Sequence, residues 1–218
     1  MKKIENLKKN KSIIILTSII ILLPMLAGIL LWSRLPERMA THFGTDNTAN
    51  GWSSKGFAVF GLPLFCLFIH LICIGATLAD PKQKGIPDNV FKMITLIAPL
   101  VSLLSAVTIY GYALNLGINI GIVVNVFVGI LFVLIGYYLP KCRQNYTVGI
   151  KLPWTLDNED NWNRTHKLAG RLWVLCGLFV IVNAFLNIGG TWSLLLILVV
   201  MTAVPAVYSF IYYLQNEK

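Results

Sequence analysis

Charged side chains are scarce in this sequence. Of its 218 residues, 12% are Asp, Glu, Lys or Arg, whereas 56% are hydrophobic. A soluble domain usually carries about 25% charged residues. The hydrophobic residues fall in long blocks that are nearly free of charge, which excludes an ordinary soluble domain. The blocks also lack the two-residue alternation of a membrane β-barrel, so helices are the expected way across a membrane.

Metal-binding and disulfide patterns are also lacking. Cys66, Cys73 and Cys176 lie inside hydrophobic blocks and Cys142 lies just past one, with no metal or redox spacing. Free thiols are therefore expected. His42 and Asp46 are too few to form a metal site without a third ligand nearby. We expect no metal and no cofactor.

The N-terminus lacks the pattern of a cleaved signal peptide. Five lysines within Met1–Lys11 precede the apolar run Ile13–Trp32. That run is longer than the hydrophobic part of a signal peptide, and no clean small-x-small cleavage site follows it. An uncleaved first membrane anchor is expected.

Six hydrophobic blocks are each near the ~20 residues that cross ~30 Å of hydrocarbon. We therefore expect an all-α, polytopic integral membrane protein, a bundle of six transmembrane helices. The predicted spans are Ile13–Trp32, Phe57–Ala79, Met93–Tyr112, Ile118–Leu139, Leu172–Ile188 and Trp192–Tyr213.

Basic residues predict the orientation of these spans. With the N-terminus inside, fifteen Lys and Arg fall in inner segments, and only Arg34, Arg38 and Lys55 fall in outer ones. This bias predicts that both termini are cytoplasmic, and it explains the net charge of +9 without direct nucleic-acid binding. The expected segments are a cytoplasmic basic tail (1–12), helices 1–4 with an outer loop at 33–56 (13–139), and a cytoplasmic loop at 140–170 followed by helices 5 and 6 (140–218).

Charge is missing from the central parts of the spans as well. Ion- and proton-coupled transporters place ionisable residues there, so a coupled pump is not expected. His70, Asn125 and Asn183 are the polar exceptions. His70 is either a functional group or a neutral imidazole hydrogen-bonded to a neighbouring helix. Prolines within four spans leave a small transporter or channel as an alternative function; they are Pro24, Pro63, Pro99 and Pro205.

The outer loop at 33–56 is rich in turn-forming residues. Asn50-Gly51 predicts a tight turn there. Phe43 and Trp52 are expected to anchor this loop, either on the bilayer or over the helix ends.

The inner loop at 140–170 has the more unusual composition. Pro153 and the residues after it predict an extended entry to a helix that begins near Asp157, which is expected to cap the first turn. Trp162 and His166 share one face of this helix, which either lies on the inner membrane surface or leads into the fifth span. His166 beside Asp157, Glu159 or Asp160 would suit acid–base chemistry in a membrane enzyme. No activated nucleophile or metal set accompanies them, so no catalytic site is expected.

Both loops resemble the SdpI family of bacterial membrane proteins. The segment Leu35–Lys55, with Leu-Pro-x-x-Met-Ala-Thr-His-Phe-Gly and Asn-Gly-Trp-x-Ser-Lys, is similar to a small domain of unknown function at the N-terminus of that family. Asn145-Tyr146-x-x-Gly-Ile-x-x-Pro-Trp-Thr-Leu and Asn161-Trp162-x-x-Thr-His-x-x-x-Gly resemble its C-terminal signature. Lys151-Leu152 replaces the usual Arg-Thr before Pro-Trp, which keeps one basic residue.

The resemblance implies a protein of the bacterial plasma membrane that protects its producer from a secreted toxic peptide, a bacteriocin. It also implies signal transduction, in which a cytosolic winged-helix repressor is held at the membrane. The expected repressor-binding residues are Lys151, Pro153, Trp154, Thr155, Asn161, Trp162, Arg164 and His166. The expected toxin-facing residues are Pro36, His42, Phe43, Asn50, Gly51 and Trp52. The lipid bilayer is the third expected partner.

Overall fold

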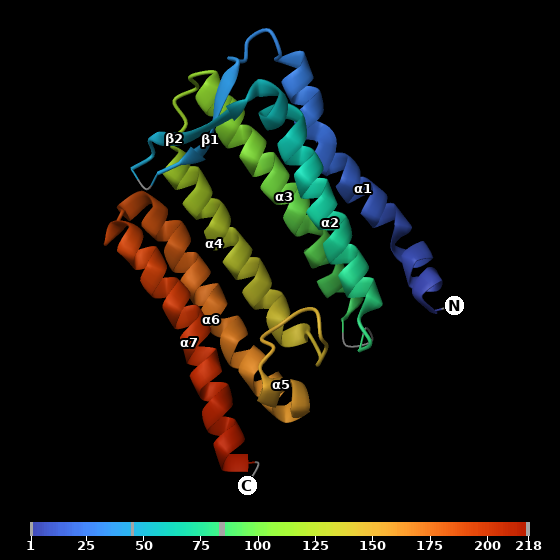
Figure 1. The fold of residues 1–218 in the computed structure, drawn as a ribbon. Helices are drawn as coiled ribbons and strands as arrows, with labels where there is room; N and C mark the ends of the chain where they lie inside the picture. Colours follow the sequence, from blue (N-terminus) through green and yellow to red (C-terminus); the bar gives the residue numbers. More distant parts are fainter. Residues whose placement is uncertain (1, 45, 83–85, 217–218) are drawn as a thin grey trace. The chain divides into compact units, whose positions relative to one another are not determined.

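The structure is a computed structural model that describes residues 2–44, 46–82 and 86–216, with side chains from Lys9 onward (Figure 1). Within these residues, six helices are long and apolar enough to cross a membrane, which confirms the predicted number of spans. They are Lys9–Leu30, Phe57–Ala79, Asp88–Ala113, Ile120–Lys141, Glu159–Leu186 and Gly190–Asn216. Lys84 and Lys218, which contribute to the predicted charge bias, lie outside the described residues.

The chain forms two compact units. Unit 1 comprises Met1–Gly75 and Ile94–Val124, and unit 2 comprises Ala76–Met93 and Asn125–Lys218. The helices and strands are α1 (Lys2–Leu30), β1 (Arg38–Phe43), β2 (Ala49–Ser54), α2 (Leu62–Ala79), α3 (Asp88–Ala113), α4 (Ile120–Tyr138), α5 (Pro153–Asp157), α6 (Glu159–Leu186) and α7 (Gly190–Asn216). A π-helical turn, Phe57–Gly61, precedes α2. Because α1 begins at Lys2, the predicted basic tail continues directly into the first helix.

The predicted outer loop of unit 1 contains a β-hairpin, an addition to the helical bundle that was not predicted from the sequence. Antiparallel pairing of β1 with β2 sets Met39 opposite Ser53 and Ala40 opposite Trp52, with irregularities on either side of His42. β1 turns Met39 and Ala40 inward, where both are almost fully buried. Met39 packs in a core cluster with Val59 and Tyr110.

The prediction of a tight turn at Asn50-Gly51 is wrong, because both residues lie inside β2. The chain reverses at 44–48 instead, where the Gly44 N–H donates to the Thr48 carbonyl and Asn47 adopts φ 63°. Asp46 stabilises this turn by accepting hydrogen bonds from the Thr48 hydroxyl and the Thr48 N–H. These bonds lower the pKa of the Asp46 carboxyl. An aspartate side chain that bonds the backbone two residues ahead stabilises a turn at its own position. The turn therefore forms at Asp46 and not at the Asn50-Gly51 dipeptide.

Lys55 ties the hairpin to the end of α1. Its ammonium group lies 2.8 Å from Glu37 Oε1 and 3.2 Å from the Trp32 carbonyl oxygen. It also lies 4.8 Å from the centre of the Trp32 ring. Only 7% of the Lys55 side chain is exposed. Lys55, which was counted among the predicted outer charges, therefore holds the hairpin in place.

In unit 2, α4 and α6 approach each other through glycines on both helices. A Cβ added to Gly129 would lie 2.7 Å from the Gly177 carbonyl oxygen, and one added to Gly136 would lie 2.8 Å from that of Gly170. Each helix therefore presents two glycines seven residues apart, paired in antiparallel order. Such small residues let the backbones of membrane helices pack closely.

α6 and α7 lie side by side and are joined by a turn at 187–189 (Figure 1). Asn183 orders this turn: its side chain accepts from the Ile188 N–H at 2.8 Å and donates to the Ser193 hydroxyl at 2.8 Å. Asn183 thus joins the end of α6 to the first turn of α7.

The beginning of α6 corrects two predictions. The segment after Pro153 is helical (α5), not extended, and α6 is capped by Asn158, whose side chain accepts from the Asn161 N–H, not by Asp157. α6 then runs without interruption into the predicted fifth span. Of the two predicted placements for this helix, continuity with the span is therefore confirmed.

Replacing Gly136 with valine should separate α4 from α6. The new side chain would meet the Gly170 carbonyl oxygen and the Val174 nitrogen, both at 2.8 Å, and rigid backbone cannot yield cheaply. We expect a loss of about 1–3 kcal/mol in the free energy of unfolding in detergent. Gly75→Val is the matched control, because a Cβ at Gly75 has nothing within 4 Å. Equal losses in both variants would contradict the glycine contact.

Candidate functional site

The predicted repressor-binding segment folds back on the start of α6. Four of its eight residues are completely buried: Thr155, Asn161, Trp162 and His166. They form hydrogen bonds inside unit 2, so they shape the segment and present no surface of their own. Lys151, Pro153 and Arg164 are exposed, and Trp154 is half-buried.

Asn161 joins α6 to α7. Its amide donates to the Ser209 carbonyl at 3.0 Å and accepts from the Ser209 hydroxyl at 2.9 Å. Thr165, one turn later, donates to the same Asn161 oxygen at 3.1 Å. A buried amide with this many partners fixes the register between the two helices.

Trp162 and His166 hold the preceding loop. The Trp162 indole N–H donates to the Cys142 carbonyl at 2.8 Å. The His166 ring stacks on Trp162 with centres 4.0 Å apart and accepts from the Ile150 N–H through Nε2 at 2.9 Å. Its Nδ1 lies 2.7 Å from the Trp162 carbonyl oxygen, to which it donates.

These contacts define the protonation state of His166. Nε2 accepts a hydrogen bond and so carries no proton, while Nδ1 carries the proton that reaches the Trp162 carbonyl. The imidazole is therefore neutral, and backbone groups occupy both nitrogens. This geometry leaves no ring nitrogen for the acid–base pairing with Asp157, Glu159 or Asp160 weighed above.

Asn145 organises the loop from within. Its amide donates to the carbonyls of Arg143 and Val148, at 2.8 and 3.0 Å, and its oxygen accepts from the N–H groups of Thr147 and Val148. Cys142 is buried just before this loop, and burial raises the pKa of its thiol to about 11. The thiol is therefore protonated near pH 7 and lacks the thiolate of a reactive cysteine.

Asp80, at the end of α2, is an anchor that the sequence analysis did not find. Its buried carboxylate accepts from the Tyr146 N–H at 2.9 Å, the Thr147 hydroxyl at 2.6 Å and the Lys82 N–H at 2.7 Å. The only sequence signal was the Asp80-Pro81 pair, which indicates a turn. A turn pattern carries no information about contacts 66 residues away in the chain.

Gln144 adds further hydrogen bonds between the Asp80–Lys82 turn and this loop. It accepts from the Lys82 ammonium at 2.6 Å and donates to the carbonyls of Thr155 and Leu156 at 2.9 and 2.8 Å. We call the segment 142–166, together with Asp80 and Lys82, the polar module. Its backbone groups are bonded to side chains from α2, α6 and its own loop, so it has a defined shape.

The exposed face of the polar module carries basic and aromatic groups. Arg164 bonds Asp160 at 2.7 Å, and Tyr212 donates to the same carboxylate. Trp154 packs against Phe210 and Tyr213 of α7, with ring centres 5.1 and 6.0 Å away. Lys151 lies 3.2 Å from the carbonyl oxygens of Tyr146 and Thr147.

The predicted toxin-facing residues separate into three sets in unit 1. His42, Asn50 and Gly51 meet across the two strands, where His42 Nδ1 bonds the Asn50 oxygen. Phe43 and Trp52 pack on Tyr112 at the end of α3, with ring centres 5.1 and 6.3 Å away. Of the two predicted anchoring modes, packing over a helix end is confirmed. Pro36 lies apart, in the segment between α1 and β1.

Inside unit 1, His70 bonds a neighbouring helix. Its Nε2 lies 3.0 Å from the Thr17 hydroxyl oxygen, and both side chains are buried. This is the contact expected from the structural interpretation of His70. Asn125, another polar residue of the predicted spans, also has an interaction partner in the structure. Within the described ranges, no three His, Cys, Asp or Glu side chains lie together as a metal site would require.

Six apolar helices, a packed hairpin in one unit and a folded polar module in the other define a multi-pass membrane protein. Residues 141–209, which include the polar module's loop, match the model of the SdpI/YfhL protein family. Residues 19–67 match a domain of unknown function, DUF1648, which contains the hairpin. The family resemblance predicted from the sequence is thus confirmed.

A curated relative extends the likeness to nearly the whole chain. The chain is 27% identical over 213 residues to "Immunity protein SdpI" of Bacillus subtilis (strain 168), covering 95% of this chain and 97% of that protein. No solved structure matches the chain.

Replacing Gly149 with alanine should loosen the polar module. Gly149 has φ 124°, and a Cβ there would collide with His166 Nε2 and lie 2.9 Å from the Trp162 ring. We expect a loss of about 1–3 kcal/mol from backbone strain, and faster hydrogen exchange at the Ile150 N–H. In the control Gly56→Ala, the backbone is helical and a Cβ meets nothing within 4 Å, so stability should be kept. Unchanged exchange at Ile150 in the Gly149 variant would contradict this role.

Proposed function

We propose that this chain is an immunity protein of the bacterial plasma membrane that protects its cell from a secreted toxic peptide by binding rather than by catalysis. The observation that carries the proposal is the end-to-end similarity to a protein named for immunity. The site supports it: His166, the central titratable group of the polar module, is neutral and held by backbone on both sides.

The proposal includes the orientation with both termini in the cytoplasm. Fifteen basic residues against three favour it. In this orientation the hairpin of unit 1 faces outward and the polar module of unit 2 faces the cytosol.

The hairpin is the proposed contact for the toxic peptide. Pro36, His42, Asn50 and Trp52 are exposed, and packing of Phe43 and Trp52 on Tyr112 holds the strands in place. A preorganised surface of this kind binds with little ordering cost.

The exposed face of the polar module is the proposed contact for a cytosolic winged-helix repressor. Lys151, Pro153, Trp154 and Arg164 would make the contact, while the four buried residues set its shape. Capture that depends on toxin requires two states of the protein that the toxin binds with different affinity.

Expression of the chain in toxin-sensitive cells should raise the killing concentration of a related toxic peptide by at least about tenfold, as expected when most of the toxin is bound. Trp52→Ala should lose most of this protection because it removes an exposed aromatic contact. Trp192→Ala is the matched control, because Trp192 is also exposed and lies outside the hairpin. Membrane levels of each variant are compared by immunoblot. Unchanged killing by every related toxic peptide would rule out the immunity role.

Repressor capture is tested by co-purification from cells that carry toxin and regulator. The double variant Lys151→Ala, Arg164→Ala should retain at least fivefold less regulator, on the order of 1 kcal/mol of binding. Lys167→Ala, an exposed cation on the same helix, should retain the full amount. The proposal of repressor capture is wrong if no cytosolic regulator co-purifies with the toxin-bound protein.

Orientation is checked in the same cells with a membrane-impermeant thiol reagent. Arg38→Cys should react in intact cells, whereas Asn163→Cys should react only after lysis, each above the background of the four native cysteines. The opposite pattern would place the polar module outside and exclude cytosolic capture.

A further inference from the structure

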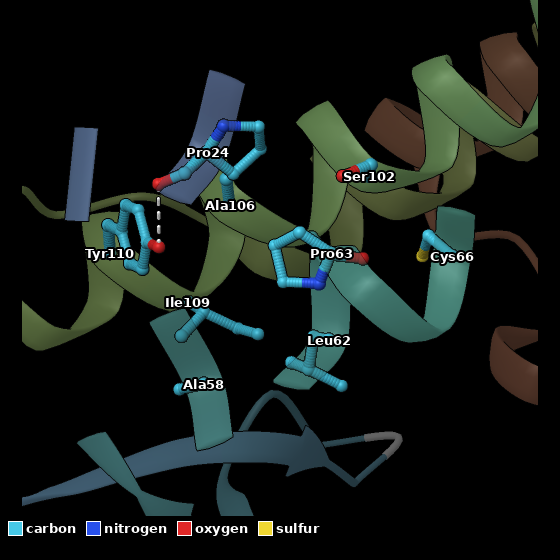
Figure 2. A pocket seen from close by; sticks show the side chains of 10 residues that line it. Pro24, Ala58, Leu62, Pro63, Cys66, Ser102, Ala106, Ile109 and Tyr110 are labelled. Carbon is cyan, nitrogen blue, oxygen red and sulfur yellow. Dashed lines mark hydrogen bonds between the residues drawn. The ribbon is translucent and has the colours of Figure 1, made fainter. Parts of the chain in front are cut away.

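Trp154 carries a buried hydrogen-bond donor that has no acceptor. Among the residues that the structure describes, its indole Nε1 is the buried side-chain nitrogen or oxygen without a hydrogen-bond partner. By contrast, Figure 2 shows the Tyr110 hydroxyl aimed at the Pro24 carbonyl, to which it donates at 3.0 Å. The Trp173 N–H likewise donates to the Met201 carbonyl at 3.1 Å. A buried donor without an acceptor destabilises the state that contains it, and exposure of the Trp154 ring relieves that cost.

Rings from the end of α7 hold Trp154 in this position. Phe210 and Tyr213 pack on its ring, with centres 5.1 and 6.0 Å away. α5, which carries Trp154, packs against α7 within unit 2. We call residues 210–216 the α7 end segment. Its aromatic side chains cover the one half-buried residue among the four proposed to contact the repressor.

The same segment also packs on Arg164, a second proposed contact residue. The Arg164 guanidinium lies 5.3 Å from the centre of the Tyr212 ring. The Tyr212 hydroxyl donates to Asp160, the carboxylate that pairs with Arg164. One displacement of the α7 end segment therefore uncovers both Trp154 and Arg164.

The attachment of the α7 end segment changes at Ser209, the residue just before it. Ser209 is fully buried and exchanges two hydrogen bonds with Asn161, at 3.0 and 2.9 Å. Beyond Ser209, the bond from Tyr212 to Asp160 lies at the surface, where 56% of the Asp160 side chain is exposed. A complete buried network resists opening, whereas an exposed bond competes with water. Ser209 is therefore the pivot beyond which α7 opens while the polar module stays folded.

We propose that the α7 end segment is an autoinhibitory cover, which opens beyond Ser209 and exposes Trp154 as the anchor for the protein partner of the polar module. The exposed ring offers an apolar face and an N–H donor. It suits a partner that presents an apolar side chain beside a hydrogen-bond acceptor. This inference rests on the proposed repressor capture and adds its regulation, because toxin would favour capture by binding the open state more tightly.

Oxidation by hydroxyl radicals, mapped by mass spectrometry on the purified full-length protein, reports whether the cover opens. Tyr212→Phe removes the hydroxyl that bonds Asp160 and should raise oxidation of Trp154 at least threefold. Tyr213→Phe is the matched control, because it removes one hydroxyl from the same segment and keeps the ring that packs on Trp154. Asp160→Ala removes the other partner of the bond and should act like Tyr212→Phe.

Trp162 is the internal reference for the fold of the polar module, because it is completely buried. Its oxidation should stay low in each of these variants. Equal oxidation of Trp154 in Tyr212→Phe and Tyr213→Phe would overturn the cover. A parallel rise at Trp162 would also overturn it, since the whole module and not the α7 end segment would then be opening.

Co-purification of a winged-helix regulator, expressed with the chain in the absence of toxic peptide, tests autoinhibition. The double variant Phe210→Ala, Tyr213→Ala should retain at least fivefold more regulator than the unaltered chain. Ile211→Ala is the matched control, because Phe210 and Ile211 are 43% and 47% exposed, and it should retain no more than the unaltered chain. Tyr212→Phe replaces the double variant if the latter does not fold.

Adding Trp154→Phe to the double variant should remove the gain, because phenylalanine keeps an apolar ring but has no N–H. Equal or lower retention by the double variant would overturn the proposal, since α7 would then be part of the docking surface and not its cover. With Trp154 oxidised as expected, absence of the regulator from every variant and from the toxin-bound chain would count against repressor capture alone.

Discussion

The close contact of α4 with α6 is the constraint on which unit 2 depends. Glycines at 129 and 136 meet glycines at 177 and 170, and no other residue lets the backbones come so near. This contact places Cys142, just after α4, within reach of Trp162 on the first turns of α6. The rest of the polar module then forms around that bond, through His166, Ile150 and Asn145.

The polar module shows how a membrane protein keeps a loop ordered with little hydrophobic core. Each anchoring side chain satisfies several backbone groups: Asn145 serves four, and Asp80 accepts three hydrogen bonds. Buried networks of this kind specify one structure when they are complete and fail when one member is lost. Variants at the buried residues should therefore act through the shape of the loop, whereas variants at Lys151 or Arg164 change the surface and leave the fold intact.

Much of the fold could be predicted because span length and charge are local properties of the sequence. The six helices follow from hydrophobic length, and the second span was predicted with the bounds that the structure gives, Phe57–Ala79. The hairpin was missed because its strands are short and polar, and because Asn50-Gly51 suggested a turn where the pairing needs a strand. The burial of Asn161 and His166 was missed because an amphipathic pattern shows which residues share a face but not what covers it. Asp80 could not be found at all, since its partners are far away in the sequence.

The paired glycines also determine where the chain can change length. One residue added within α4 or α6 turns everything beyond it by ~100° and moves one glycine of each pair off the contact. A residue added in the loop between them leaves both pairs intact and disturbs only local hydrogen bonds. Natural insertions and deletions in this part of the chain should therefore collect between the end of α4 and the beginning of α6. The surface offered to partners can diverge there while the helices that carry it keep a fixed alignment.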